Sequence, residues 1–244
     1  GLDVSSGQGE PDAQLLDRVF SQPEFVIRDG TVVWTDDMRA VAPLELHAVN
    51  VVLRNRSRLH EFRFDATPPA EWGDRFTTMA RFEQPFLSID NGRWQDWSGQ
   101  VFADLSRIDV AQLKQYADPG VEIERARGAV RAWIDVQRGK VVGATADVAL
   151  AEVAVRVGGD LAPLQLASLS GRLSGKFSAD STVLATRALA FDTADGIRWP
   201  GGNFTLQQQH ASGARPASGE LVADRLDLSA LAQIAGRLPL GDGL

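Results

Sequence analysis

Along most of the chain, apolar and polar residues alternate with a period of two. Successive side chains of a strand point to opposite faces, so this period places every second residue on the same face. Four stretches show it clearly: Val130, Ala132, Ile134 and Val136; Val142, Ala144, Ala146, Val148 and Leu150; Phe62, Phe64 and Ala66; and Phe76, Thr78, Ala80 and Phe82. The pattern predicts a mainly β protein whose strands have one apolar and one polar face.

Turn-forming residues separate these runs. Asp29-Gly30 suits a two-residue turn with positive φ angles, so residues 24–37 predict a hairpin. Arg138-Gly139 predicts another. Helical spacing of apolar residues occurs around residues 12–20, 109–117 and 227–238, and each stretch ends close to a proline. We therefore expect short linking or capping helices between sets of strands.

One sequence motif occurs twice, as WSGQVFADLSRIDVAQL at residues 97–113 and as GELVADRLDLSAL at residues 219–231. The two copies lie roughly 120 residues apart, which is long for a solenoid unit of about 20 to 50 residues. Asp109 and Asp227 stand where a strand passes into a helix and suit the N-cap position. We expect a leader and first helix in residues 1–23, a first β module in 24–118 and a second in 119–244.

Two architectures fit this many strands, because a sheet of about a dozen strands has to curl, split or flatten. A closed antiparallel sandwich or barrel would bury the apolar faces against each other. A curled sheet lined by Val, Ala and Gly would leave an apolar trough. A strand of 8 or 9 residues spans roughly 27 Å, against about 15 Å of hydrocarbon in one membrane leaflet. Such a trough is long enough for an acyl chain, and periodicity alone leaves both architectures open.

Composition limits the classes of partner and the cellular compartments that fit this chain. The chain has 25 basic and 32 acidic residues among 244, a formal charge of −7, which argues against a nucleic-acid-binding surface. It contains no cysteine, which suits either a reducing cytosol or a bacterial periplasm. No run approaches the roughly 20 apolar residues of a membrane helix, and the first residues do not read as a signal peptide. From its two ends we expect a segment of a longer protein, with any anchor outside it.

Motifs for catalysis or metal binding are not evident. His47, His60 and His210 have no third ligand at a metal-like spacing, so each reads as a solvated or strand-face histidine. Neither a nucleophile elbow nor a phosphate-binding glycine loop occurs. Tryptophans could form a sugar-binding platform, and a carboxylate pair such as Asp36 and Asp37 could serve a glycosidase, but no carboxyl separation follows from sequence. We expect no enzyme, no cofactor and no metal.

Several segments together are similar to a known family. They are RDGTVVWTDD at residues 28–37, LELHAVNVVLRNRSRLHEFRFDATPPAEWGDRF at 44–76 and WSGQVFADLSRIDVAQL at 97–113. Their order and spacing resemble the YhdP-type, AsmA-like envelope proteins of Gram-negative bacteria, relatives of TamB. The resemblance is best over about residues 24–115.

The resemblance implies curved antiparallel β-groove modules, taco-like in section, within a periplasmic bridge that carries phospholipid between inner and outer membranes. Partners would be phospholipid or another acyl-chain lipid and adjoining modules of the same longer chain, whose parent protein an N-terminal helix would anchor to the inner membrane. The alternative is a structural or protein-binding β domain with a packed core. The predicted lipid-lining residues are Phe62, Phe64, Phe82, Val130, Ala132, Ile134, Val136, Val142, Ala144 and Val148.

Overall fold

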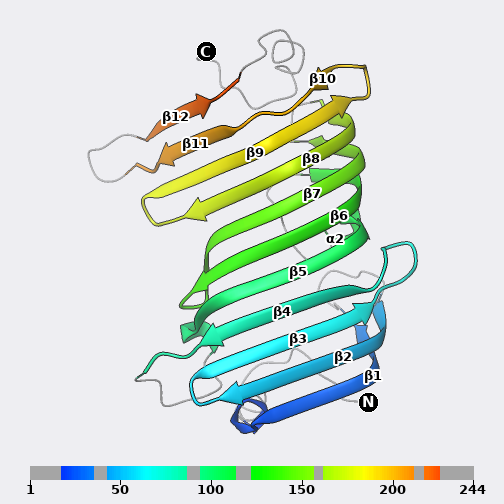
Figure 1. Ribbon diagram of the computed structural model, residues 1–244, viewed down its shortest axis with the longest axis vertical. Coiled ribbons are helices and arrows are strands. Elements are labelled where there is room, and N and C mark those ends of the chain that lie inside the picture. The colour runs from blue at the N-terminus through cyan, green and yellow to red at the C-terminus, as the bar shows by residue number, and fades with distance from the viewer. Residues whose placement is uncertain are drawn as a thin grey trace.

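The computed structural model describes residues 18–35, 43–86, 94–113, 122–156, 162–211 and 217–225. Most of them form one antiparallel sheet in which neighbouring strands follow chain order, apart from one two-residue strand that lies beside this path (Figure 1). The strands are β1 (Glu24–Trp34), β2 (Leu44–Arg56), β3 (Leu59–Thr67), β4 (Phe76–Glu83), β5 (Ser98–Asp109), β6 (Glu122–Gln137), β7 (Lys140–Arg156), β8 (Leu164–Phe177), β9 (Ser181–Thr193), β10 (Arg198–Trp199), β11 (Phe204–Gln209) and β12 (Ser218–Ala223). The prediction of a mainly β protein is confirmed.

Helices are short in the described part of the chain: a turn at residues 18–21, the 3₁₀ turn η1 (Trp94–Asp96) and α2 (Val110–Leu113). Asp109 caps α2 as predicted, because its Oδ1 accepts a hydrogen bond of 3.1 Å from the N–H of Ala111. The carbonyl of Trp72 accepts from the N–H of Asp109 at 2.7 Å, so the segment after Pro68 and Pro69 fixes the start of the helix. Asp227 and most of the predicted first and last helices lie outside the described residues.

The sheet is a single open layer. Its strand order runs from β1 to β12 without returning to β1, so it is not the closed sandwich or barrel that periodicity also allowed. The predicted curved, groove-like sheet is confirmed. β5 pairs directly with β6, from Gly99 opposite Val136 to Asp109 opposite Arg127. The two modules proposed from the repeat therefore share one sheet, and their boundaries stay a prediction.

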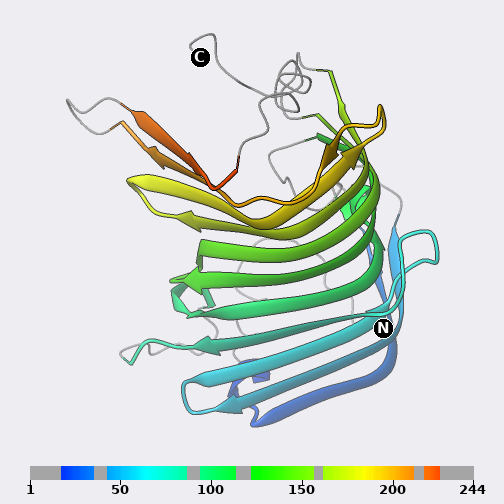
Figure 2. The same ribbon diagram turned by 45° about the horizontal axis from the view of Figure 1, so that its top comes forward.

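Most long strands bend at about the same level, which folds the sheet into a trough (Figure 2). The bend follows a line of β-bulges, and the residues with positive φ angles lie in these bulges or directly opposite them. A bulge turns its strand while keeping it in the sheet. The residues on this line are Asp29 (52°), Ala48 (47°), Gly128 (152°), Glu152 (52°), Gly171 (139°) and Ala188 (52°).

The predicted hairpin at Asp29-Gly30 is wrong. β1 runs straight through this dipeptide, since Ile27 pairs with Val51 on one side and Val32 pairs with Leu46 on the other. Asp29 takes the positive φ angle that its sequence predicts, but it uses that angle in a bulge. The same backbone preference serves a turn and a bulge, so the local sequence does not distinguish them.

A small hydrophobic core fills the inside of the bend. Ala126, Val153 and Leu166 are buried there. Val110 of α2 and the partly buried Ile123, Leu150, Val155, Leu164, Leu169 and Phe191 pack against them. Side chains on the two sides of a bend can pack together only on its inner face. Leu150 follows Val148 in the period-two stripe of β7, so the predicted apolar stripes face into the trough.

Candidate functional site

A line of apolar residues crosses the inner face of the trough from β1 to β12. Strand register aligns one residue from each of eleven successive strands into a line that we call the inner row. Its members are Phe25, Leu53, Phe62, Ala80, Val101, Ile134, Ala144, Gly175, Leu184, Leu206 and Leu221. With about 4.8 Å between strands, the inner row extends roughly 48 Å. None of its residues is polar or charged, so the trough has an uninterrupted apolar floor.

One residue further along the same strands, the side chains point to the outer face, and most of them are polar or charged. The register there aligns Glu24, Arg54, Glu61, Arg81, Gln100, Asp135, Gly143, Lys176, Val183, Gln207 and Glu220. Cross-strand ion pairs continue this pattern: Arg131 contacts Asp104 at 3.4 Å, and Arg172 contacts Asp147 at 2.6 Å. The hydrogen bond from Arg172 lowers the pKa of the Asp147 carboxyl. The sheet therefore separates an apolar inner face from a hydrated, charged outer face.

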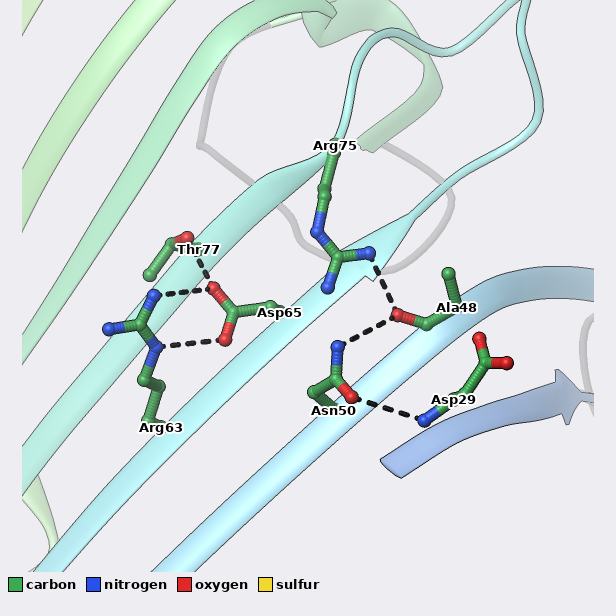
Figure 3. A network of polar contacts seen from close by, with 7 residues as sticks. All are labelled: Asp29, Ala48, Asn50, Arg63, Asp65, Arg75 and Thr77. Carbon is green, nitrogen blue, oxygen red and sulfur yellow. Dashed lines mark hydrogen bonds and ion pairs between the residues drawn. The ribbon is translucent and has the colours of Figure 1, made fainter. Parts of the chain in front are cut away.

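A polar network holds the bend between β1 and β2 (Figure 3). The Asn50 side chain accepts from the N–H of the bulge residue Asp29 at 3.1 Å and donates to the carbonyl of Ala48 at 3.4 Å. Arg75 donates to the same carbonyl at 2.7 Å. These bonds satisfy backbone groups that the bulges remove from the regular ladder.

The neighbouring carboxylate of Asp65 in β3 accepts hydrogen bonds from Arg63 and from the Thr77 hydroxyl (Figure 3). The hydrogen bond from Arg63 is the main cause of the lowered pKa of Asp65. The group is therefore charged at neutral pH and stays on the outer face, away from the trough.

The structure places the predicted lining residues together, with one exception. Phe62 and Phe64 of β3, Phe82 of β4, four alternate residues of β6 and two of β7 lie on the inner face; the β6 and β7 residues are Val130, Ala132, Ile134, Val136, Ala144 and Val148. Val142 lies at a bulge, because Val136 pairs with Val141 while Asp135 pairs with Gly143. Val142 lines a depression together with Asp135 and Lys176. That any of these residues contacts lipid stays a prediction.

The list based on sequence omits several inner-row residues. Leu184 in β9, Leu206 in β11 and Leu221 in β12 extend the apolar floor beyond β8. The period-two pattern is weaker in β9 and β11, because the polar residues Thr182, Thr186 and Gln208 lie on the same face as Leu184 and Leu206. These three leucines are aligned by the pairing of strands, and that pairing cannot be read from the sequence alone.

An apolar cavity of about 440 Å³ lies at the end of the trough opposite the bend. Its walls come from β1 to β4 and β6, from the residues just before β5 and just after β6, and from the helical turn at residues 18–21. They are Val19, Phe20, Phe25, Val51, Leu53, His60, Phe62, Ala80, Phe82, Trp97, Val136 and Gly139. The cavity thus includes inner-row residues and opens from the same apolar floor.

An aromatic cluster forms one wall of this cavity. The rings of His60 and Trp97 stack with centroids 3.9 Å apart and planes 2° apart. Phe20 meets the Trp97 ring edge-on at 4.8 Å and the His60 ring at 5.8 Å. His60 and Trp97 are buried, with 2% and 4% of their surface exposed. Burial lowers the pKa of His60, although Gln84 opposes the shift, so the imidazole is neutral at neutral pH.

The helical turn over the cavity is tied down by one side chain. Asn55 donates from Nδ2 to the carbonyls of Val19 at 3.3 Å and Gln22 at 2.6 Å. Its Oδ1 lies 2.7 Å from Nδ1 of His60. Because the amide nitrogen is already used as a donor, Oδ1 is the acceptor, and His60 carries its proton on Nδ1. Asn55 therefore connects the turn above the cavity to the aromatic wall below it.

Other candidate sites are weaker. No group of three or more His, Asp or Glu residues that could hold a metal ion occurs within the six described ranges. An open depression of about 960 Å³ on the outer face is lined by charges of both signs, among them Arg54, Glu61 and Arg81. No helix in the described part of the chain is long and apolar enough to cross a membrane.

Comparison with known proteins identifies a matching family. A family model described as YhdP protein matches residues 2–243 of the chain. Searches of the curated proteins and of the solved structures return no match. The family match covers nearly the whole chain, including both copies of the repeated motif at residues 97–113 and 219–231.

Proposed function

Since the chain belongs to the YhdP family, an AsmA-like family, we propose that it is a segment of a bridge-like lipid transport protein of the bacterial envelope. Acyl chains would lie on the inner face of the trough, and head groups would remain in water at its opening. This role needs weak, repeated apolar contacts along a path and no catalytic residue. The cargo we propose is phospholipid, moving through the periplasm between the two membranes.

The observation that carries this proposal is the inner row. An apolar line of roughly 48 Å exceeds the full hydrocarbon thickness of a bilayer, about 30 Å. A packed core would bury such residues, yet Val101, Ile134 and Ala144 are only half-buried. An extended apolar surface that stays partly accessible marks a binding surface for apolar partners. The charged outer face explains how such a sheet stays dissolved.

The alternative of a structural β domain with a fully packed core receives no support from the fold. The sheet is open, and the buried cluster at the bend involves only a small part of the inner face. Most inner side chains on the long arms of β5 to β8 are half-buried, and Leu173 is exposed. A lipid-carrying surface accounts for this accessibility.

Two adjacent residues of β7 give a matched test. Ala144 lies in the inner row, and Thr145 lies on the outer face opposite Trp133; both are half-buried. In Ala144→Asp, a carboxylate on the apolar path must lose water when an acyl chain passes. We expect this variant to take up at least about tenfold less phospholipid from vesicles than wild type, about 1.4 kcal/mol. Thr145→Asp should bind as wild type does.

Uptake is measured by native mass spectrometry after the chain is incubated with phosphatidylethanolamine vesicles and separated from them. Circular dichroism and the unfolding midpoint show that both variants are folded. Failure of the wild-type chain to take up lipid, or equal uptake by folded Ala144→Asp, would overturn the proposal.

A further inference from the structure

We propose that the cavity beneath Phe20, at the covered end of the trough, is a binding pocket for the end of a single hydrocarbon chain. The inference rests on the proposed function, because it takes the same class of cargo. It adds a defined site at which one tail is held. The pocket and the trough share Phe62, Ala80 and Val136, so a chain lying on the floor can enter without crossing a polar surface.

The chemistry of the walls selects the occupant. No residue that lines the cavity has a formal charge at neutral pH, since its one titratable side chain, His60, is buried and neutral. Placing a head group, a carboxylate or an ammonium there would remove it from water without a charged partner, which is costly. A hydrocarbon tail has no polar atom to satisfy, so the methyl end of an acyl chain fits these walls.

The geometry of the covering turn distinguishes the pocket from the rest of the floor. Val19 and Phe20 lie over the ends of β2 and β3 and over Trp97 just before β5, so the pocket is partly covered where the trough is open. The turn is held to the sheet by the Asn55 side chain and by the bond from the Asn55 N–H to the carbonyl of Pro23, 2.9 Å long. An enclosed apolar site gives a tail contacts on several sides, so it should retain the tail longer than an open surface does.

The chain contains no cysteine, so a single introduced cysteine reports on one position. Ala80 lines the pocket, and Ala146 lies on the inner face of β7 outside it; both alanines are half-buried. Ala80→Cys and Ala146→Cys are therefore a matched pair of small changes. The rate of alkylation by iodoacetamide is measured without ligand, with one equivalent of palmitate, and with phosphatidylethanolamine vesicles. The two ligand arms distinguish a free fatty acid from a phospholipid tail.

With one equivalent of palmitate, we expect alkylation to slow at least about tenfold in Ala80→Cys and less than twofold in Ala146→Cys. Adding Phe20→Ala to Ala80→Cys should remove this preference, because the enclosing ring is lost. As a second readout, 9,10-dibromostearate should quench tryptophan fluorescence in the wild-type chain, and most of the quenching should disappear in Trp97→Phe.

The outcomes separate the pocket from the proposed function. Equal protection at both positions, or protection in Ala146→Cys alone, would overturn the pocket and leave lipid binding by the trough intact. Quenching that is unchanged in Trp97→Phe would also overturn the pocket. Lack of protection and of quenching with every ligand would overturn both.

Discussion

The first strands and the central strands of the sheet use the same strand geometry for different inner surfaces. In β1 to β4 the inner face is mainly aromatic, with Phe25, Phe62, Phe64 and Phe82, and the helical turn encloses one end of it. In β6 to β8 the corresponding positions are mostly small, among them Ala132, Ala144, Ala146, Gly171 and Gly175. Large rings and a covering turn make a cavity, whereas small side chains leave an open, shallow floor.

The two regions also make the bend in different ways. Near β1, asparagine side chains replace the missing ladder bonds, since Asn50 accepts from the bulged Asp29. Asn203 repeats this device near the other end of the sheet, where its Oδ1 accepts from the N–H of the bulged Ala188 at 2.8 Å. In the central strands, glycine takes the unusual backbone angles at Gly128 and Gly171. At these two positions the bend therefore depends on the absence of a side chain, whereas Glu152 of β7 takes a φ of 52°.

The largest expected effect comes from filling that space in the centre. In Gly128→Val, the new Cβ would overlap the carbonyl oxygen of Ala149, and valine disfavours a φ of 152°. We expect a loss of at least about 3 kcal/mol in the free energy of unfolding, measured with urea, or failure to fold.

Gly219→Val is the matched control, because the nearest atom to its new Cβ is the Gln207 carbonyl oxygen at 3.9 Å. Valine suits a strand, so this variant should change stability by less than about 1 kcal/mol. Similar losses in both variants would show that the central bend does not depend on Gly128.

A smaller effect is expected at the asparagine-held bends. Asn50→Ala leaves the N–H of Asp29 and part of the Ala48 carbonyl without their partner, which should cost about 1 to 2 kcal/mol in the same unfolding assay. Asn203→Ala should cost less, because the residue is exposed and water can replace it. Gln208→Ala, an exposed change on β11, should stay within about 0.5 kcal/mol of wild type. If Asn50→Ala has the same free energy of unfolding as Gln208→Ala, the Asn50 side chain does not stabilise the bend.

Sequence periodicity predicted the faces of the strands well, because alternation depends only on local geometry. Every predicted lining residue except Val142 lies on the inner face, and Val142 departs because a bulge shifts the register of β7. The N-cap at Asp109 was also predictable, since a capping carboxylate acts on residues next to it in the chain. Family resemblance, not periodicity, favoured the open sheet over a closed one.

The bend and the cavity could not be predicted in the same way. Ala48, Glu152 and Ala188 have positive φ angles that their residue types do not indicate, so the bend is imposed by neighbouring strands. The cavity brings together Phe20, His60 and Trp97, which are far apart in sequence. His60 was predicted as a solvated or strand-face histidine; it is on a strand but buried, because the turn at residues 18–21 covers it.

The smallest predicted effect is a pH dependence confined to the enclosed end. Burial lowers the pKa of His60 below its ordinary value of 6.5, so the unfolded chain binds a proton more readily than the folded chain does. The contribution of the neutral imidazole is therefore present above about pH 6.5 and is lost as the pH falls below it. Thermal unfolding at pH 7.5 and 5.5 should show a larger drop in Tm for wild type than for His60→Phe, which keeps a ring beside Trp97. His47 and His210 are present in both proteins, so the difference isolates His60. An equal drop in the two proteins would mean that protonation of His60 does not oppose closure of the aromatic wall, and the pocket would then be as stable in acid as the open trough.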